Sequence, residues 1–284
     1  MSNADLLPRL QRLLGEDGKL LDVAVDHGAV NEPALLGGIS DMREALETLR
    51  AAGPDAIQLT PGMARLLAGR RSSADPRLVL RTDVSNVYGA AVPRSPSCEL
   101  LPGAVTTAVR IDAACVVANL LLLPDQPELH SQCVRNVGAL RQECERVGMP
   151  LMVEPLVMAP NETAGGYQVD GDLDRITALV RQAAELGADV IKADPCSVPA
   201  EFHRVITAAS GVPVLVRGGG RAQDTEILER TVAIMRQGAI GIVYGRNIFQ
   251  HQNPTAMVAA LMAVVHDDVD APTAAELLHR HSAA

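Results

Sequence analysis

The stretch GADVIKADP, residues 187 to 195, contains a helix end, a short apolar strand and a lysine inside that strand. Gly187 is typical of the residue that ends a helix, and the β-branched pair that follows it favours a strand. Pro195 prevents the strand from continuing. The order of helix, glycine and strand predicts a parallel α/β fold, and it places Lys192 near the C-terminal end of a strand.

Lys192 has the clearest chemical meaning in this stretch. Burial disfavours the ammonium form, so it lowers the pKa of a lysine. The neutral amine can then attack a carbonyl carbon and form a Schiff base. The alternative is a structural lysine that pairs with a neighbouring carboxylate, since ion-pair networks also perturb buried amines.

Short β-branched runs alternate with longer amphipathic stretches along the whole chain. About eight such runs occur, the number that closes a (β/α)8 barrel, so we expect a single α/β domain of the TIM-barrel type. The segments between the runs have apolar residues at helical spacing and end in glycine, which predicts helices over 41–53, 127–148, 172–187 and 224–238. The expected strands are LDVAV (21–25), AIQL (56–59), LVLRT (78–82), CVVANLLLL (115–123), PLMVEPL (150–156), DVIKAD (189–194), VPVLVR (212–217) and IGIVYG (240–245).

One domain is expected over residues 1–284. No Pro/Ser-rich linker or abrupt shift of composition divides the chain, and barrels of this length commonly form one domain. The chain from about residue 271 is expected to be a loosely attached tail. The segment from Val84 to Pro102, rich in Ser, Pro and Gly, is the longest irregular stretch. It is either an active-site lid or a disordered surface loop.

The composition argues against several classes of function. The formal net charge is −9, the pI is near 5.3, and the chain has no block of Lys or Arg. These features argue against nucleic-acid binding and against contact with an anionic membrane surface. Aromatic residues make up 2% of a chain that is 48% hydrophobic. The core must therefore be aliphatic, and stacking platforms for single-stranded nucleic acid are missing.

The cysteines and the N-terminus indicate the compartment. The five cysteines are odd in number and lack a CxxC pair, which favours neither a disulfide framework nor a zinc cluster. A reducing cytoplasm fits best. The N-terminal MSNADLLPRLQRLL has no apolar signal core, and no apolar run approaches the ~20 residues of a membrane span. We therefore expect a soluble, cytoplasmic protein.

Two carboxylates are expected beside Lys192, because chemistry in such barrels lies at the C-terminal ends of the strands. Asp26 follows the first expected strand and Glu154 lies on the fifth. Both can move protons during carbinolamine formation, its dehydration and C–C cleavage. The alternative for Asp26 is a turn or a helix cap. The alternative for Glu154 is an ion pair that merely holds Lys192 protonated.

His27, next to Asp26, is either a proton carrier or a packed, hydrogen-bonding loop residue. A metal site made of Asp26, His27 and Glu154 is disfavoured, because no pair of histidines has the spacing of ligands on one helix face. We therefore expect neither a metal ion nor another cofactor.

The loops after the seventh and eighth expected strands have the composition of a phosphate site. RGGGR (217–221) is rich in glycine and leads into an expected helix, and YGRNIFQ (244–250) adds a glycine and an arginine. Bare backbone N–H groups and an arginine can hold an anion. Barrels of this type often bind phosphate with these two loops, although a lone GGG is more often a turn. The candidate residues are Arg217, Gly218, Gly219, Gly245 and Arg246, with Arg221 as an alternative to Arg217.

Together these motifs resemble those of the class I aldolases of the DeoC/FbaB type, especially the archaeal-type fructose-bisphosphate aldolases and their tagatose-bisphosphate and sulfofructose-phosphate relatives. VAVDHG (23–28) is similar to the family's first-strand motif, and GADVIKADP to its Schiff-base strand. RGGGR resembles its glycine pair followed by a basic residue, and GIVYGRNIFQ (241–250) resembles its terminal phosphate motif. The resemblance spans most of the barrel.

The resemblance implies that Lys192 is the nucleophile and that Asp26 takes part in proton transfer and in positioning the carbonyl. It also implies that the glycines of the last two loops, together with Arg246, bind phosphate. One departure concerns the fifth strand. Where archaeal fructose-bisphosphate aldolases carry a tyrosine just before a proline, this chain has Glu154 before Pro155, as in the tagatose-bisphosphate and sulfosugar members. The proton donor and acceptor is then expected to be a carboxylate.

The third and fourth strands match the family patterns less well. They leave Arg81, Asp83 and Asn119 as contacts for the aldehyde end of the substrate, and the aldehyde itself is not fixed by the sequence. The resemblance implies in addition a homo-oligomer.

The sequence thus predicts a metal-independent class I aldolase, an aldehyde-lyase that cleaves or forms a ketose phosphate. Dihydroxyacetone phosphate is the expected ketone half. The alternatives within the family are transaldolase-like or acyl-transferring enzymes, of the amino-dideoxyheptulosonate synthase or phospho-sugar thiolase type. A non-catalytic sugar-phosphate sensor is the alternative from another class.

Overall fold

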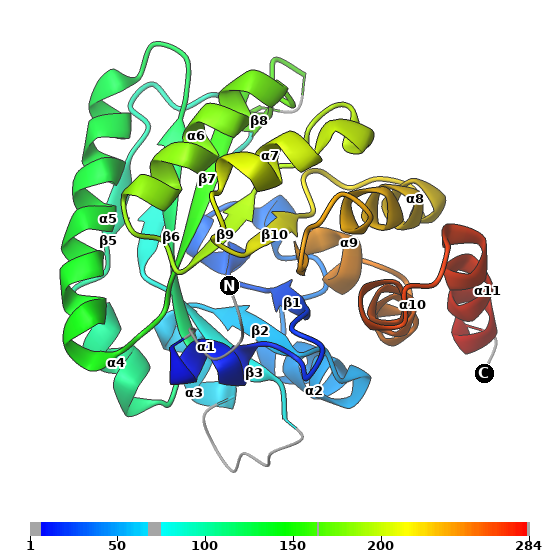
Figure 1. Ribbon diagram of the computed structural model, residues 1–284. Coiled ribbons are helices and arrows are strands. Elements are labelled where there is room, and N and C mark those ends of the chain that lie inside the picture. Colours follow the sequence, from blue (N-terminus) through cyan, green and yellow to red (C-terminus); the bar gives the residue numbers. More distant parts are fainter. Residues whose placement is uncertain (1–6, 68–74, 164, 283–284) are drawn as a thin grey trace.

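The computed structural model describes residues 7–67, 75–163 and 165–282, so the N-terminal MSNADL lies outside the described residues. Eight parallel strands close into a barrel that helices surround (Figure 1). Around the ring the order is β1, β2, β3, β6, β7, β9, β10 and β11, and β11 pairs with β1. The expected single (β/α)8 barrel is confirmed. Its strands are β1 (Leu20–Ala24), β2 (Ala56–Leu59), β3 (Arg77–Arg81), β6 (Cys115–Leu122), β7 (Leu151–Pro160), β9 (Val190–Ala193), β10 (Val214–Arg217) and β11 (Gly241–Tyr244).

The eight expected runs form these eight strands. The largest difference is on the fifth, where β7 continues past the expected end at Leu156 to Pro160. The chain then turns back as β8 (Tyr167–Val169), which pairs antiparallel with the end of β7. This hairpin stands beside the mouth of the barrel.

The expected helices begin and end at the capping residues of the sequence. Asp41 Oδ1 accepts hydrogen bonds from the backbone N–H groups of Arg43 and Glu44, and Gly53 ends that helix at a φ of 71°. At positive φ a glycine avoids the steric cost of a side chain. The helices are α1 (Pro8–Leu13), α2 (Met42–Ala52), α3 (Pro61–Leu67), α4 (Ala104–Arg110), α5 (Pro127–Val147), α6 (Leu173–Glu185), α7 (His203–Ala208), α8 (Asp224–Met235), α9 (Arg246–Phe249), α10 (Pro254–His266) and α11 (Ala271–Ser282), with single 3₁₀ turns η2 (His27–Val30), η3 (Pro33–Leu35) and η4 (Pro199–Glu201).

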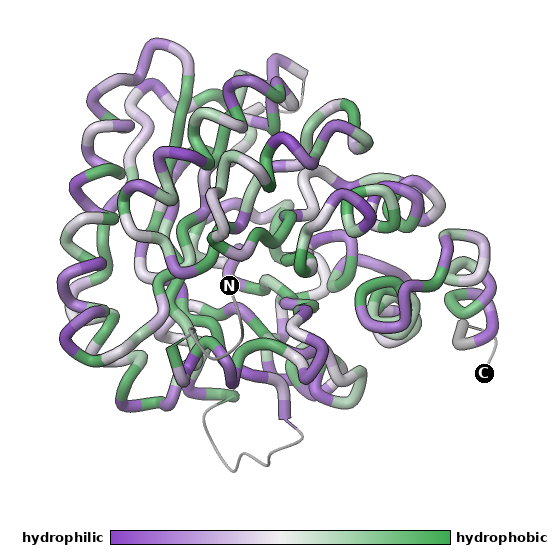
Figure 2. The backbone as a smooth tube through the Cα atoms, viewed as in Figure 1, coloured by the Kyte–Doolittle hydropathy of each residue, from purple (hydrophilic) through white to green (hydrophobic). Residues whose placement is uncertain are grey.

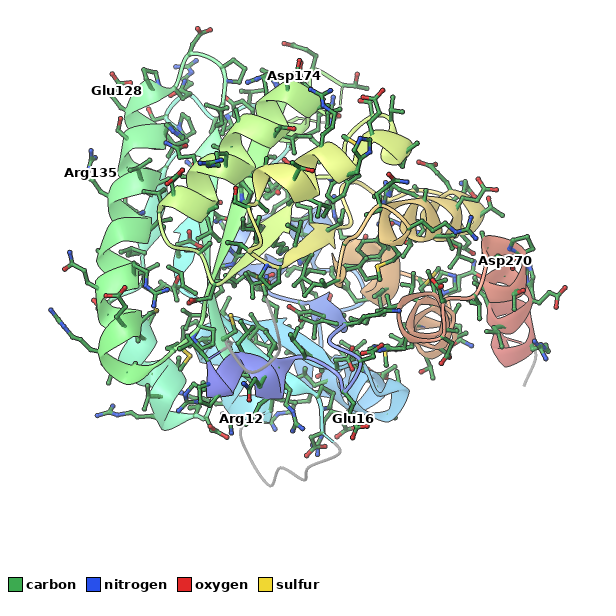
Figure 3. The ribbon with its side chains drawn as sticks, viewed as in Figure 1. Arg12, Glu16, Glu128, Arg135, Asp174 and Asp270 are labelled. Atoms are coloured by element: carbon green, nitrogen blue, oxygen red, sulfur yellow. The ribbon has the colours of Figure 1, made fainter. Side chains whose placement is uncertain are left out.

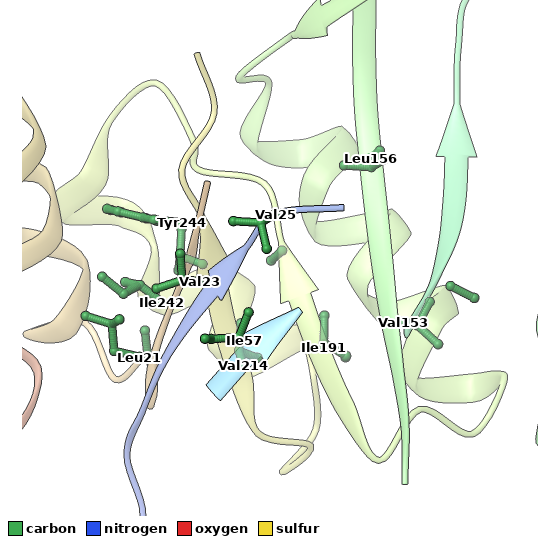
Figure 4. Close-up of a cluster of buried hydrophobic side chains, with 14 of the residues drawn as sticks. Leu21, Val23, Val25, Ile57, Val153, Leu156, Ile191, Val214, Ile242 and Tyr244 are labelled. Carbon is green, nitrogen blue, oxygen red and sulfur yellow. The ribbon is translucent and has the colours of Figure 1, made fainter. Parts of the chain in front are cut away.

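Two layers of aliphatic side chains hold the barrel together, because successive residues of a strand point to opposite faces. One layer lies between strands and helices; Figure 4 shows Val23, Ile57 and Ile191 from it. The other lies inside the barrel and includes Leu20 and Val243, with the two buried leucines of α1 closing the N-terminal end. Polar residues that share the inward alternation therefore point into the barrel near the C-terminal ends of the strands.

The outer helices present a polar face to the solvent. In Figure 2 the tube of α5 alternates between hydrophilic and hydrophobic segments. Figure 3 shows Glu128 and Arg135 of α5 and Asp174 of α6 pointing away from the barrel. Among the described helices, none is long and apolar enough to cross a membrane.

The segment from Val84 to Pro102 is more regular than the sequence indicates. Its ends form a two-stranded antiparallel ribbon of β4 (Asp83–Ser85) and β5 (Cys98–Leu100). The backbone N–H of Tyr167 on β8 donates a hydrogen bond to the carbonyl oxygen of Val87. The segment is thus tied to the β7–β8 hairpin.

The expectation of a loose tail from about residue 271 is corrected. Residues 271–282 form α11, which packs beside α10 (Figure 1). Ala274 and Leu278 are buried, and their spacing of four puts both on one face of the helix. The short apolar stripe of this helix is sufficient to dock it.

Candidate active site

A pocket at the C-terminal ends of the barrel strands brings the predicted site residues together. Parallel strands end at the same rim of a barrel, so residues far apart in sequence converge there. The pocket is lined by every residue proposed from the sequence except Arg221: Asp26, His27, Arg81, Asp83, Asn119, Glu154, Lys192, Arg217, Gly218, Gly219, Gly245 and Arg246.

Lys192 lies on β9, and 4% of its surface is exposed. Its Nζ lies 3.0 Å from Glu154 Oε1 on β7. It also donates a hydrogen bond of 3.3 Å to Gln58 Oε1 on β2. A buried ammonium is stable only with such partners, and it must lose a proton before the amine can add to a carbonyl. The carboxylate of Glu154 stands within reach of that proton.

Arg81, at the end of β3, joins the carboxylates of the site. Its Nε donates to Asp26 Oδ2 at 2.7 Å, and one terminal nitrogen donates to Glu154 Oε2 at 2.6 Å. The other terminal nitrogen lies 3.4 Å from Asp83 Oδ1 and 3.1 Å from Asn119 Oδ1. The planar guanidinium fixes the relative positions of these groups.

Asp83 and Asn119 orient this guanidinium from behind. Asp83 Oδ2 accepts hydrogen bonds from the backbone N–H of Asn119 at 2.7 Å and from the thiol of Cys98 at 3.3 Å. Burial raises the pKa of Asp83 although Arg81 opposes this effect. Asp83 and Asn119 thus hold one end of the Arg81 guanidinium, while Asp26 and Glu154 make its shorter contacts.

Two carboxyl groups of the site are held ionised. Burial would raise the pKa of Glu154, but Lys192 and Arg81 outweigh it and lower this pKa to about 2. Burial acts on Asp26 in the same direction, and Arg81, His27 and Lys192 hold its pKa well below the ordinary value. Both groups are therefore carboxylates at neutral pH.

His27 is packed rather than free to carry protons. Burial lowers the pKa of its ring to about 4, although Asp26 opposes this shift. The ring meets Phe249 edge to face, with the ring centroids 5.1 Å apart. Gly245 is required beside it, because a Cβ at that position would lie 2.6 Å from His27 Cε1. Neutral His27 therefore forms a wall of the pocket.

The opposite end of the pocket is cationic. Arg217 Nε pairs with Asp194 Oδ1, and Arg217 Nη1 donates to the hydroxyl of Tyr88 at 3.1 Å. Arg246 donates to the carbonyl oxygen of Gly219 at 3.2 Å, and within the described residues no carboxylate lies within ion-pair distance of it. Burial lowers the pKa of Arg246, as do the neighbouring arginines. A bound anion would supply the missing negative charge.

Of the two arginines proposed for RGGGR, Arg217 lines the pocket, and Arg221 is exposed outside it. Gly219 has a φ of +65°, which favours glycine. Asn247 steadies this loop, since its amide donates to the carbonyl oxygens of Gly218 and Gly220 and accepts from the N–H of Ala222.

Sequence reasoning missed three residues of the pocket and its surroundings. Gln58 donates to Asp26 Oδ2 at 2.6 Å and accepts from Lys192. The signal for it was present, because Gln58 is a lone polar residue in an apolar strand. Asn247 sits inside a motif already recognised. No sequence pattern indicated Tyr88, because its position in the pocket depends on a tertiary contact with Arg217.

The arrangement can therefore hold an anion at one end and present an amine flanked by ionised carboxylates at the other.

Known proteins resemble the chain over nearly its full length. It is 30% identical to an uncharacterized aldolase of Saccharolobus solfataricus over 93% of this chain and 96% of that protein. It is 30% identical to a 2-amino-3,7-dideoxy-D-threo-hept-6-ulosonate synthase of Halobacterium salinarum over 95% of each chain. A Schiff-base-forming fructose-1,6-bisphosphate aldolase has the same fold, with a TM-score of 0.74, 23% identity and coverage of 92% of this chain and 100% of that one. The sequence model of the DeoC/LacD family aldolases matches residues 20–251, and the chain belongs to that family.

Proposed function

We propose that the protein is a class I aldolase that forms or cleaves a ketose phosphate through a Schiff base on Lys192. The observation that carries this proposal is the buried amine of Lys192, set between Glu154 Oε1 and Gln58 Oε1 in a pocket whose far end is cationic. If Lys192 and Glu154 formed only a structural ion pair, the cationic group of Arg217 and Arg246 in the same pocket would have no explanation.

In the cleavage direction the amine of Lys192 adds to the ketone carbon, and loss of water gives an iminium ion. The C3–C4 bond then breaks, and its electron pair moves into the iminium to give an enamine. The proton of the C4 hydroxyl passes to a carboxylate, for which Asp26 and Glu154 are the candidates. Protonation of the enamine at C3 and hydrolysis release the ketone and restore the amine.

Dihydroxyacetone phosphate is the proposed ketone half. Its phosphate would meet Arg246, Arg217 and the backbone of the glycine loop, while its carbonyl faces Lys192. The molecule has one phosphate and one carbonyl, as the two ends of the pocket require.

A transferase of the heptulosonate-synthase type is the second candidate, because the Halobacterium salinarum relative carries that name at 30% identity. It would use the same amine and the same anion-binding end. The two candidates differ in the second substrate. A cytoplasmic location and a homo-oligomeric assembly stay predictions of the sequence.

The test is hydrogen exchange at C3 of dihydroxyacetone phosphate in D2O, followed by NMR, with no aldehyde present. Enamine formation requires this exchange whatever the second substrate is. We expect exchange with the native chain and with Lys19→Arg, and none with Lys192→Met. Binding of dihydroxyacetone phosphate in calorimetry without exchange would refute the proposal.

A further inference from the structure

A second chamber of about 610 Å3 opens beside the catalytic pocket, between the loops that follow β1, β2 and β3. The two spaces share Asp26, Ala29 and Val84 on their walls. The second space is therefore the direct neighbour of the pocket that contains Lys192. We name it the acceptor chamber; the large apolar side chains of its wall include Leu36, Ile39, Met42, Met63 and Leu101.

The acceptor chamber is apolar although it opens to solvent. Leu36 is 38% exposed and Met63 is 41% exposed, and both stand among the few large hydrophobic residues of the described chain with so much free surface. Polar groups on its wall are mainly hydroxyls, such as those of Ser40, Thr60 and Thr107. Exposed apolar surface gathered in a concave site indicates a binding role.

The charges around this chamber exclude a phosphate. Among its described lining residues Asp26 is the one charged side chain, and it is an anion. Arg81 of the catalytic pocket, the cation bound to Asp26, is already paired with Asp83 and Glu154 as well. A second phosphate would face a carboxylate, and the described lining of the chamber supplies no cation to match it. Arg246, for which the described residues supply no carboxylate partner, lines the catalytic pocket and not the acceptor chamber.

We propose that the acceptor chamber binds the electrophile of the reaction, and that this electrophile is an aldehyde with an apolar, unphosphorylated chain. This inference rests on the proposed function and names its second substrate. The enamine carbon C3 attacks the aldehyde carbon, the carbonyl oxygen takes a proton and becomes the C4 hydroxyl, and water releases the ketose phosphate from Lys192.

A small molecule fits the acceptor chamber better than a second copy of the chain does. Its volume falls within the range of small-ligand pockets, roughly 300 to 1,000 Å3. The chamber shares Asp26 and Ala29 with the pocket that contains Lys192, and this position beside the amine suits a substrate better than a protein surface. The hydroxyl groups along the wall suit the few polar atoms of such an aldehyde.

The test compares three aldehydes with dihydroxyacetone phosphate as donor: hexanal, glyceraldehyde and glyceraldehyde 3-phosphate. We expect kcat/KM for hexanal to exceed that for glyceraldehyde 3-phosphate by about tenfold or more, the scale of discrimination by an apolar pocket. An equal or better rate with the phosphorylated aldehyde would overturn the inference. So would hydrogen exchange at C3 with no product from any of the three aldehydes.

Variants then locate the effect. Met63→Lys should lower kcat/KM for hexanal about tenfold and narrow the gap to glyceraldehyde 3-phosphate, because it puts a cation on an apolar wall. Leu36→Ser is the milder second variant, should Met63→Lys fold poorly. Val147→Lys on α5 alters a residue that is 45% exposed and away from the site, and it should change neither rate.

Light scattering on each variant tests the remaining alternative, in which the acceptor chamber is an interface between copies of the chain. A change of assembly in Met63→Lys with an unchanged preference among the aldehydes would assign this surface to contacts between copies and overturn the inference. If hydrogen exchange at C3 is itself absent, the proposed function is wrong, and the assignment of the acceptor chamber falls with it.

Discussion

Arg81 controls the charge state of the catalytic pocket. Its guanidinium offsets the burial of Asp26 and Glu154, and so it helps to keep their pKa values low. In Arg81→Met burial is no longer offset, both pKa values rise, and the carboxylates need a higher pH to stay ionised. We expect C3 exchange at neutral pH to fall about 100-fold, the scale of a lost proton-transfer group.

The pH dependence of C3 exchange checks this expectation. The acid limb of the Arg81→Met profile should lie at higher pH than that of the native chain. Arg204→Met, which breaks the surface pair with Asp174, should leave the profile in place. An unshifted acid limb in Arg81→Met would show that Arg81 does not set these pKa values.

Asp22 on β1 is an ionisable residue that does not line the catalytic pocket. It is fully buried, and within the described residues neither carboxylate oxygen has a hydrogen-bond partner. Burial raises its pKa to about 7, opposed by Lys192. Between about pH 4 and pH 7 the folded chain therefore holds a proton that the unfolded chain has released. Stability from this group is greatest at low pH and is lost as the pH rises through 7.

Asp22→Asn removes the ionisable group, and with it the loss of stability at high pH. We expect its Tm to exceed the native value at pH 8 by roughly 5 °C, since a few kcal/mol shift the Tm of a chain of this size by that much. The difference should shrink toward pH 4. Thermal unfolding at both values measures it, with the exposed Glu16→Gln as control. A lower Tm for Asp22→Asn at pH 8 would mean that Asp22 has a partner after all.

At the scale of elements, the β11–α9 turn depends on close approach at Gly245. A Cβ there would meet His27 Cε1 at 2.6 Å and the carbonyl oxygen of Ala24 at 2.9 Å. Gly245→Ala must therefore displace the turn that carries Arg246. We expect the Kd for dihydroxyacetone phosphate to rise about tenfold, which corresponds to about 1.4 kcal/mol.

Gly220→Ala is the matched control, because no atom lies within 4 Å of the Cβ it would add. Its affinity in calorimetry should equal that of the native chain. Equal weakening by both substitutions would indicate general damage to the glycine loop rather than a specific clash at the turn.

The elements that the sequence predicted best are those with their own periodic pattern. The run AIQL forms β2 at its expected bounds, and α2 begins and ends at its Asp and Gly caps. β8 and the β4–β5 ribbon were not predicted, because each is short and pairs with a partner that local pattern does not reveal. Tyr88 was missed for the same reason, since 129 positions separate it from Arg217.

At the scale of the whole molecule, the site could be predicted because the C-terminal ends of all barrel strands lie at one rim. Once eight strands were expected, the residues ending each strand had to share one rim, and the structure brings Asp26, Glu154, Lys192 and Arg246 to one pocket. The pairing within the pocket was not predictable. That Arg81 binds Asp26 and Glu154 together depends on side-chain reach across the barrel, and alternation along a strand gives no information about it.

His266, at the end of α10, ties the outer helices to the N-terminal end of the barrel. Its ring nitrogens lie 2.9 Å from Asp17 Oδ2 and 2.9 Å from Asp55 Oδ2. The hydrogen bond with Asp55 is the main cause that raises its pKa to about 9. A raised pKa means that this contribution to stability is complete below about pH 6.5 and is lost as the pH rises through 9.

His266→Gln should lower the Tm by a few degrees at pH 6, roughly the effect of losing one charged hydrogen-bonded pair. The difference from the native chain should vanish above pH 9. Unfolding scans from pH 6 to 10 test this, with the exposed His279→Gln on α11 as control. A difference that stays constant over this range would exclude the ionised pair as its source.

The most direct test of the central claim uses the lysine content of the chain, which has only Lys19 and Lys192. Lys19→Arg is incubated with dihydroxyacetone phosphate and borohydride, and the reduced adduct is mapped by intact mass and peptide analysis. The account predicts one adduct, on the peptide that carries Lys192, and none when Lys192→Met is added. Bound ligand without an adduct at Lys192, or an equal adduct in the double variant, would contradict it.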